Sequence, residues 1–193
     1  DATATLSGNN NGGVFYMNCG TFVTFVGTNI AASSNVVDCS ANTIHNNGIA
    51  TNGGNSNGGA GLYISAYNGC NATVVDSMFS NNVVYARDSV AYGALNSNGG
   101  GGVYFSPTYP SPGTVFVKLS NVQFINNTVD STDSYSSGSL GQANGGAGMF
   151  VSGIMASSVE IDVQDVSFFS NTVRSTNQNA TANRNGGGGM YVF

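Results

Sequence analysis

The sequence predicts one all-β domain, residues 1–193, in which parallel strands stack as the coils of a solenoid. Three observations lead to this class: an internal repeat, strand-like alternation of apolar and polar residues, and a composition poor in helix formers. The 193 residues include 28 Gly, 27 Asn, 24 Ser and 15 Thr, but only five Leu and one Glu. Helical bundles and doubly wound folds need long runs of helix-forming residues, so both are excluded. Disorder is disfavoured because 40% of the residues are hydrophobic.

The first motif of the repeat is a glycine run followed by a short apolar strand. Its copies recur at spacings of 41 or 46 residues and begin at Asn57-Gly58, Asn98-Gly99, Asn144-Gly145 and Asn185-Gly186. A degenerate copy begins at Asn11. We expect the glycines at a corner of the coil, where neighbouring backbones approach closely and a Cβ atom would be penalised. The repeats therefore start near residues 11, 57, 98, 144 and 185.

An aromatic residue stands between two apolar residues after each glycine run, as in Leu62-Tyr63-Ile64. Successive strand residues point to opposite faces, so we expect the apolar pair in the core and the aromatic residue outside. This predicts a surface aromatic column formed by Tyr63, Tyr104, Phe150 and Tyr191.

The second motif is an apolar residue followed three positions later by asparagine and five positions later by a β-branched residue. Its apolar members are expected in the core, and they are Phe79, Phe124 and Phe168. Its asparagines are expected at the next bend, and they are Asn82, Asn127 and Asn171. Asparagine tolerates left-handed backbone geometry, and its amide can bond to the backbone or to an asparagine of a nearby coil. Residues 44–49 are interpreted as a weaker first copy of this motif.

The length of the repeat predicts the size of one coil. Because each repeat of 41–46 residues carries two strand motifs, we expect two coils of about 20–25 residues per repeat and about nine coils in all. Residues 159–165 alternate apolar and polar side chains, as a half-buried strand should.

Together, the Gly-Gly-Ala-apolar and Phe-x-x-Asn motifs resemble the repeats of chlamydial polymorphic outer membrane proteins. The resemblance covers residues 11–193. It implies a right-handed parallel β-helix, which is the fold of the extracellular part of that family.

Charge and motif spacing exclude several functions. The net charge is −5, and the four cations, Arg87, Lys118, Arg174 and Arg184, are too few and too scattered to bind nucleic acid. No apolar run approaches the 18 or more residues of a membrane helix, so membrane insertion of this segment is not expected. The glycine runs lack the Gly-Lys-Ser/Thr ending of a phosphate-binding loop.

Parallel β-helices include polysaccharide lyases and hydrolases, so catalysis has to be considered. Glu160, Asp162 and Asp165 lie close in sequence, but they are more simply explained as a solvated strand face and a turn residue. Asp130 and Asp133 in a Ser-rich loop leave open a weak calcium site, although a solvated loop is favoured. We predict no catalytic residue, no cofactor and no metal ion.

Two features favour an extracellular or cell-surface protein. Acceptor sequences for N-linked glycans begin at Asn71, Asn126 and Asn179. Cys19 and Cys39 are 20 residues apart, close to one expected coil, so we predict a disulfide between them. This leaves Cys70 free or paired outside the chain.

The last residues of the sequence predict self-association. A solenoid with an open end exposes apolar core positions and unpaired backbone groups. The strand-like end contains Met190, Tyr191, Val192 and Phe193. Two explanations are open: the sequence is part of a longer β-helix, or this end docks on the N-terminal coil of another copy. The sequence thus favours a glycosylated structural protein that forms a head-to-tail filament. The alternative is a surface adhesin or glycan-binding module that uses the aromatic column.

Overall fold

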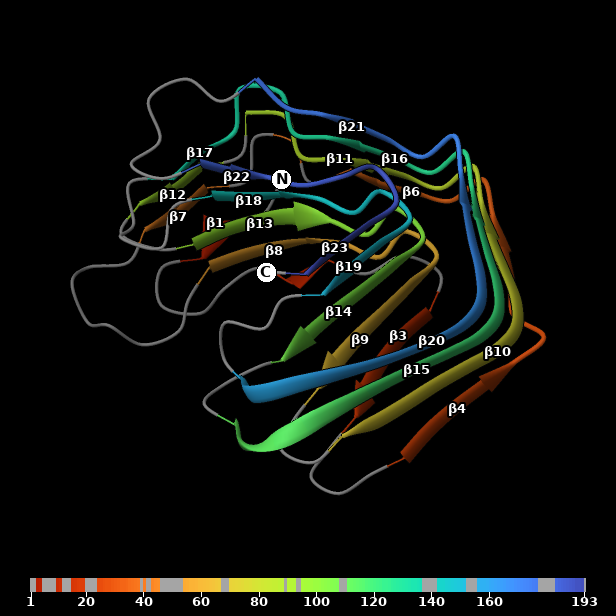
Figure 1. The fold of residues 1–193 in the computed structure, drawn as a ribbon. Coiled ribbons are helices and arrows are strands. Elements are labelled where there is room, and N and C mark those ends of the chain that lie inside the picture. The colour runs from red at the N-terminus through yellow and green to blue at the C-terminus, as the bar shows by residue number, and fades with distance from the viewer. Residues whose placement is uncertain are drawn as a thin grey trace.

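Parallel β-strands are the regular secondary structure of the described part of this protein. The computed structural model describes residues 3–4, 10–11, 15–19, 24–38, 40, 43–45, 54–66, 70–88, 90–92, 95–107, 111–136, 142–151, 156–176 and 183–192. Within these ranges there is no helix, and the strands form five parallel sheets (Figure 1). The all-β class predicted from the composition is confirmed for this part of the chain.

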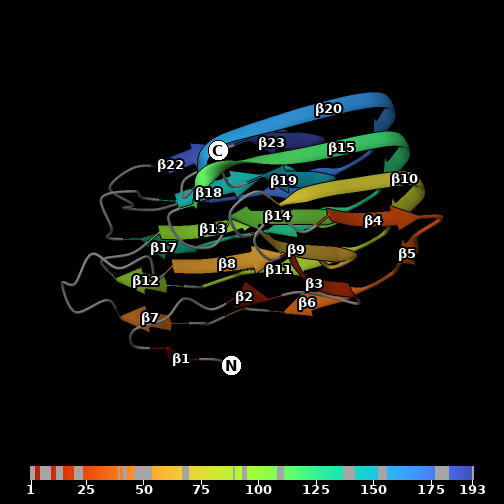
Figure 2. The ribbon, with the colours of Figure 1, turned by 90° about the horizontal axis from the view of Figure 1, so that it is seen from below.

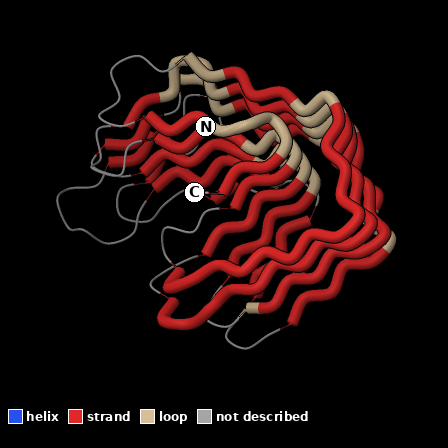
Figure 3. The backbone as a smooth tube through the Cα atoms, in the orientation of Figure 1, coloured by secondary structure: helices blue, strands red, loops and turns tan. Residues whose placement is uncertain are grey.

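One complete repeat contributes a single strand to each of the five sheets. Its strands are β10 (Asn71–Ser80), β11 (Val83–Tyr85), β12 (Val90–Tyr92), β13 (Leu95–Gly99) and β14 (Val103–Pro107). We call the strands of one repeat a layer, and we name each sheet after its member in this layer. Figure 3 shows the layers lying one on another, with their strands and bends aligned.

The remaining strands extend these sheets on both sides. The β10 sheet also contains β4 (Thr24–Thr28), β5 (Ala31–Ser33), β15 (Ser111–Ile125) and β20 (Ala156–Phe169). The β11 sheet also contains β6 (Val36–Asp38), β16 (Thr128–Asp130) and β21 (Thr172–Arg174). The β12 sheet also contains β1 (Thr3–Ala4), β7 (Thr43–His45) and β17 (Tyr135–Ser136).

The last two sheets each have five strands. The β13 sheet also contains β2 (Asn10–Asn11), β8 (Gly54–Gly58), β18 (Gln142–Gly145) and β22 (Asn183–Asn185). The β14 sheet also contains β3 (Phe15–Cys19), β9 (Leu62–Ala66), β19 (Met149–Val151) and β23 (Met190–Val192). Figure 2 shows that β1 and β22 lie at opposite ends of the stack.

The pairing register shows that one repeat makes one layer. Asn57 pairs with Asn98, Asn98 with Asn144, and Asn144 with Asn185. The expected two coils per repeat, and the total of about nine, are therefore wrong. The two motifs mark two corners of the same layer, and the chain crosses all five sheets before it returns to the same register.

Two of these corners pack against each other, which explains why the motifs alternate. A Cβ atom on Gly102 would lie 2.8 Å from the Phe124 ring, and one on Gly101 would lie 3.1 Å from the Asn82 carbonyl oxygen. Glycine is required there because the bend that carries the Phe-x-x-Asn motif fills the space of a side chain.

The β14 sheet is buried on both faces. One face joins the β10 sheet in the main core, which includes Leu62, Phe105 and Phe124. The opposite face forms a second cluster with the β13 sheet, which includes Tyr104 and Ala143 (Figure 1). A third cluster lies between the β11 sheet and the glycine corner. Apolar contacts between layers and between sheets thus hold the described fold together.

Candidate functional site

The asparagines of the second motif form a ladder that runs through the layers. Asn82 donates from its backbone N–H and its Nδ2 to Oδ1 of Asn127, at 3.1 and 3.0 Å. Asn127 donates in the same way to Oδ1 of Asn171, at 3.0 and 2.9 Å. Asn82 and Asn127 are fully buried, so each amide replaces water as the partner of its neighbour.

The ladder contains a fourth member that the sequence interpretation missed. Asn35 donates from its backbone N–H and its Nδ2 to Oδ1 of Asn82, at 3.2 and 2.8 Å. Ala32 pairs with Phe79 in the β10 sheet, so the first copy of the motif is residues 32–37 and not residues 44–49. An alanine in place of the phenylalanine hides this copy, although its asparagine and its valine keep their spacing.

The left-handed residues of the bend are the neighbours of these asparagines. Positive φ occurs one position earlier, at Ser34, Asn81, Asn126 and Ser170. The expectation that Asn82, Asn127 and Asn171 themselves adopt this geometry is therefore wrong. Their amides serve the contacts between layers, while the preceding residue turns the chain.

The phenylalanines of the second motif stack in a parallel column. The Phe79 and Phe124 ring centroids are 5.4 Å apart, and those of Phe124 and Phe168 are 4.9 Å apart. Phe79 and Phe124 are fully buried, whereas Phe168 in the last layer is only partly buried. The same side chain therefore has a different environment at the end of the stack.

The predicted surface aromatic column is wrong, because its residues lie inside the protein. Tyr63, Tyr104 and Phe150 are fully buried, and Tyr191 packs against them. Their rings cover the glycines of the β13 sheet, where a Cβ atom on Gly58, Gly99, Gly145 or Gly186 would collide with an aromatic ring. The alternation pattern fails here because a neighbouring sheet covers the face that a single sheet would leave in solvent.

One ion pair joins two neighbouring layers at the end of the β11 sheet. Arg87 donates from Nε and Nη2 to Oδ2 of Asp130, at 2.9 and 2.6 Å. Thr132 donates to the other carboxylate oxygen, and the guanidinium lies 4.6 Å from the Tyr85 ring centroid. Burial raises the pKa of Asp130, but the hydrogen bonds from Arg87 and Thr132 outweigh burial and leave the pKa below its usual value.

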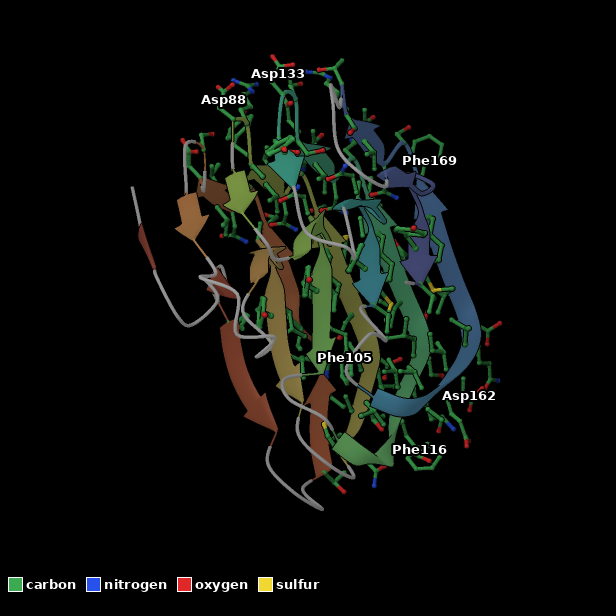
Figure 4. The ribbon with its side chains drawn as sticks, turned by 90° about the vertical axis from the view of Figure 1, so that its left-hand side faces the viewer. Asp88, Phe105, Phe116, Asp133, Asp162 and Phe169 are labelled. Atoms are coloured by element: carbon green, nitrogen blue, oxygen red, sulfur yellow. The ribbon has the colours of Figure 1, made fainter. Side chains whose placement is uncertain are left out.

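The acidic side chains of the described residues lie at separate places in the fold. Asp130 is committed to Arg87, and Asp88 and Asp133 extend from neighbouring turns at one edge (Figure 4). Asp162 lies on the outer face of β20, 3.4 Å from Nζ of Lys118. In the described ranges, no three His, Cys, Asp or Glu side chains are close enough to share a metal ion.

The two described glycan acceptors lie at the surface. Asn71 begins β10, Asn126 lies at a bend, and both are exposed. Asn179 lies outside the described residues. Glycosylation at the three positions stays a prediction.

Cys70 is disulfide-bonded. The chain has three cysteines, so a bond that uses Cys70 is incompatible with the predicted pair of Cys19 and Cys39. The spacing argument failed because 20 residues are less than half of one layer: Cys19 ends β3 in the β14 sheet, whereas Cys39 lies outside the described residues. Cys19 pairs in the backbone register with Ala66, four residues before Cys70.

The predicted assembly residues belong to the C-terminal end layer, which contains β20, β21, β22 and β23. Met190 and Val192 are exposed, Tyr191 is partly buried, and Phe193 lies outside the described residues. Phe169 is 66% exposed and Val163 is 44% exposed, although Leu119, the register partner of Val163, is fully buried. Figure 4 shows Phe169 projecting from the end of β20. This layer therefore presents apolar side chains at positions that the interior layers bury.

The opposite end is also apolar. The outermost strands of the five sheets at this end are β1 to β6, which we call the N-terminal end layer, and Phe15, Val26 and Val36 are exposed there. Asp38 lies at the end of β6, where a hydrogen bond from the Ser40 backbone holds its pKa below the usual value. The two ends of the stack are therefore the candidate functional surfaces.

Within the described residues, no helix is long and apolar enough to cross a membrane. No protein-family model matches this chain, and comparisons with curated proteins and with solved structures found no significant match.

Proposed function

We propose that this chain is a right-handed parallel β-helix that serves as a non-enzymatic structural subunit and stacks head to tail with other copies of itself. The observation that carries the proposal is the C-terminal end layer, where apolar side chains at core positions are exposed. Removing apolar surface from water contributes about 25 cal/mol of stabilising free energy per Å². A second copy that covers these side chains therefore forms a stabilised complex.

The open edges of the strands add to this attraction. In the interior, backbone groups of each layer bond to the layers above and below, as in the bond from Asn126 N–H to the Phe169 carbonyl oxygen, at 2.9 Å. The outer side of β20 has no strand beside it in the described part of the chain. An edge of this kind pairs readily with another strand, and a head-to-tail contact that does not close produces a filament.

An extracellular or cell-surface location fits this role. The disulfide at Cys70 is of a kind that persists in oxidising compartments. The exposed Asn71 and Asn126 are available to carry glycans on the side of such a filament. Covalent glycans and other copies of the chain are thus the proposed partners.

The alternative role as an adhesin or glycan-binding module loses its binding surface. It depended on an exposed aromatic column, and Tyr63, Tyr104 and Phe150 are fully buried. The polysaccharide lyase or hydrolase alternative depended on the acidic residues of β20. Of these, Asp162 pairs with Lys118 on an open strand face, which does not favour catalysis.

The proposal is tested with two matched methionines. Met190 in the C-terminal end layer is 36% exposed, and Met78 on the outer face of β10 is 40% exposed. We expect the purified chain to form filaments visible by electron microscopy and to sediment as polymers. Met190→Asp should abolish them and leave a folded monomer, whereas Met78→Asp should leave assembly unchanged. A chain that stays monomeric at high concentration, or a Met190→Asp variant that assembles normally, would refute the proposal.

A further inference from the structure

Exposed aromatic rings accompany both described glycan acceptors. Three phenylalanines are exposed among the described side chains, and they are Phe15, Phe116 and Phe169. Phe116 lies beside the acceptor Asn71, and Phe169 lies beside the acceptor Asn126. We infer that each of these two rings is a stacking platform for the first sugar of an N-linked glycan on the neighbouring asparagine. This assignment rests on the glycosylation that is part of the proposed function, and it adds the protein surface on which the sugar lies.

Phe116 is exposed for a reason other than its place in the stack. Phe15 and Phe169 belong to the end layers, whereas Phe116 lies on β15, which has β10 on one side and β20 on the other. Its neighbours along the strand, Val115 and Val117, are buried in the main core. Phe116 therefore points away from the core, and Figure 4 shows it projecting from the sheet. The ring leaves apolar surface in water in the middle of the stack, where no missing layer accounts for it.

Asn71 is the register partner of Phe116 in the β10 sheet. Both side chains are exposed, so they leave the same outer face of the sheet in the same direction. The other members of this column, Thr24 and Glu160, are polar. A glycan attached to Nδ2 of Asn71 therefore begins directly beside the Phe116 ring.

The spacing of the layers suits ring stacking. In the interior of this protein, rings on register partners stack with their centroids 5.1 Å apart, as Tyr63 and Tyr104 show. A sugar ring held by Asn71 has the same layer spacing from Phe116. One face of that sugar consists of C–H groups with partial positive charge, and the face of an aromatic ring is the negative part of its quadrupole. Contact between the two faces also removes apolar surface of both rings from water.

The second acceptor has the same arrangement. The Asn126 backbone N–H donates to the Phe169 carbonyl oxygen at 2.9 Å, and both side chains are exposed. Asn81 occupies the same left-handed bend one layer earlier, but no acceptor sequence begins there. Asn81 donates in the same way to Ile125, which is only partly exposed and not aromatic. An exposed aromatic ring thus lies one layer beyond each described acceptor, and not beyond the equivalent bend that lacks the acceptor sequence.

Attachment of the glycan needs a lipid-linked donor. An oligosaccharyltransferase takes the glycan from a lipid diphosphate, so that the C1–O bond to the diphosphate breaks as the C1–Nδ2 bond forms and the amide nitrogen loses a proton. The acceptor sequence requires the hydroxyl group two positions later, on Thr73 or Thr128. Substitution of either threonine by valine therefore prevents attachment and leaves the asparagine unchanged.

A double-mutant cycle tests the contact at Asn71. Four proteins are secreted from cells that attach N-linked glycans: the wild type, Thr73→Val, Phe116→Leu and the double variant. Mass spectrometry measures the glycan on Asn71 in each. With Phe116 in place, we expect the glycan to raise the melting temperature by about 2–3 °C, the size expected for one aromatic contact in a chain of this length. In the Phe116→Leu background this gain should disappear, because leucine is apolar but offers no flat ring.

The controls isolate the ring and the first sugar. Made in cells that attach no glycans, the four proteins should show no coupling between the two positions. Trimming with an endoglycosidase that leaves one sugar on each asparagine should preserve the gain. Phe116→Tyr keeps the ring and should also keep it. Met78→Leu is the matched control, because Met78 is 40% exposed on the outer face of the same sheet and its column holds no acceptor, so the glycan on Asn71 should stabilise this variant as much as the wild type.

The same cycle with Thr128→Val and Phe169→Leu tests the second platform. We expect the gain from the glycan on Asn126 to depend on Phe169 in the same way. Equal gains with phenylalanine and leucine at this position would remove Phe169 from the assignment.

The outcomes separate this inference from the proposed function. If Asn71 carries a glycan that stabilises the wild type and Phe116→Leu equally, Phe116 is not a platform, and glycosylation stands. If trimming to one sugar removes the gain, the contact belongs to later sugars and the assignment is wrong. If the secreted wild type carries no glycan on Asn71 or Asn126, the inference fails together with glycosylation, whereas head-to-tail assembly is judged independently by electron microscopy.

Discussion

The interior layers and the C-terminal end layer contain the same kinds of residue, but only the interior layers bury them. Phe124 stacks between Phe79 and Phe168, whereas Phe168 has a ring on one side only in the described residues. Leu119 is fully buried, and its register partner Val163 is exposed. A repeat therefore needs its neighbouring layers, in addition to contacts among its own sheets, to bury its apolar side chains. Stability in this fold is a property of stacked pairs of layers.

Truncation of a stacked phenylalanine should show the largest difference between interior and end. Phe124→Ala removes a fully buried ring and leaves a cavity, so we expect a loss of about 3–5 kcal/mol in the free energy of unfolding. Phe168→Ala removes a partly buried ring and should cost about 1–2 kcal/mol. Urea unfolding of the two variants measures the difference, and equal losses would contradict the comparison.

Glycine substitutions should give the second-largest difference in stability between the interior and the end of the stack. A Cβ atom on Gly99 would collide with the Phe150 ring and approach the Gly145 carbonyl oxygen, so Gly99→Ala should cost about 2–3 kcal/mol. A Cβ atom on Gly187 would meet only the Met190 carbonyl oxygen, at 3.9 Å, so Gly187→Ala should change stability by less than about 0.5 kcal/mol. Thermal unfolding followed by circular dichroism tests both. A stable Gly99→Ala variant would mean that the aromatic rings can move away from the β13 sheet.

Removal of a ladder amide should have an intermediate effect. Asn127→Ala leaves buried donors of Asn82 and the Phe79 carbonyl oxygen without their partner, and should cost about 2–3 kcal/mol. Asn171→Ala affects a partly exposed amide, where water replaces the lost bonds, and should cost about 1 kcal/mol. Hydrogen exchange at the Asn82 amide provides a local measurement, and it should accelerate in Asn127→Ala. Unchanged protection there would show that the ladder does not hold the layers together.

Acidification should have the smallest effect on stability. It compares the carboxylate of an interior layer, Asp130, with that of an end layer, Asp38. The pKa of Asp130 is lower in the folded protein than the ordinary value of 3.8, so the folded state binds its proton less tightly than the unfolded chain. The ion pair with Arg87 thus contributes stability above about pH 4 that is lost as the pH falls through the folded pKa. Arg87→Met should remove part of the acid sensitivity in unfolding experiments between pH 6 and 2.

Asp38 provides the comparison for this titration. Its pKa is also lowered, chiefly by the Ser40 backbone N–H, but it lies exposed in the N-terminal end layer. Asp38→Asn should therefore alter the acid sensitivity less than Arg87→Met. The reverse order would show that the ion pair between layers is not the main acid-sensitive contact.

Particular residues show how much of the fold could be predicted from the sequence. The spacing of Asn57, Asn98, Asn144 and Asn185 correctly identified equivalent positions of the repeat. The expectation of two coils per repeat would have separated them, whereas the backbone register pairs these four directly and in order. Asn35 was missed because Ala32 stands where the other copies have phenylalanine, although Val37 keeps the motif spacing. The same spacing did not reveal how many strands the chain makes before it returns, because a period measures the length of a circuit and not its number of corners.

The sequence by itself determined the all-β class, the equivalent positions of successive repeats, and the need for glycine at a corner where neighbouring backbones approach closely. Only the tertiary structure decided that one repeat makes one layer, that Tyr63, Tyr104 and Phe150 are covered, and that Cys70 forms the disulfide. The physical reason is that alternation along a strand defines two faces but does not say what covers each of them. Burial depends on the neighbouring sheet and the neighbouring layer, and both are set by how the whole chain folds back on itself.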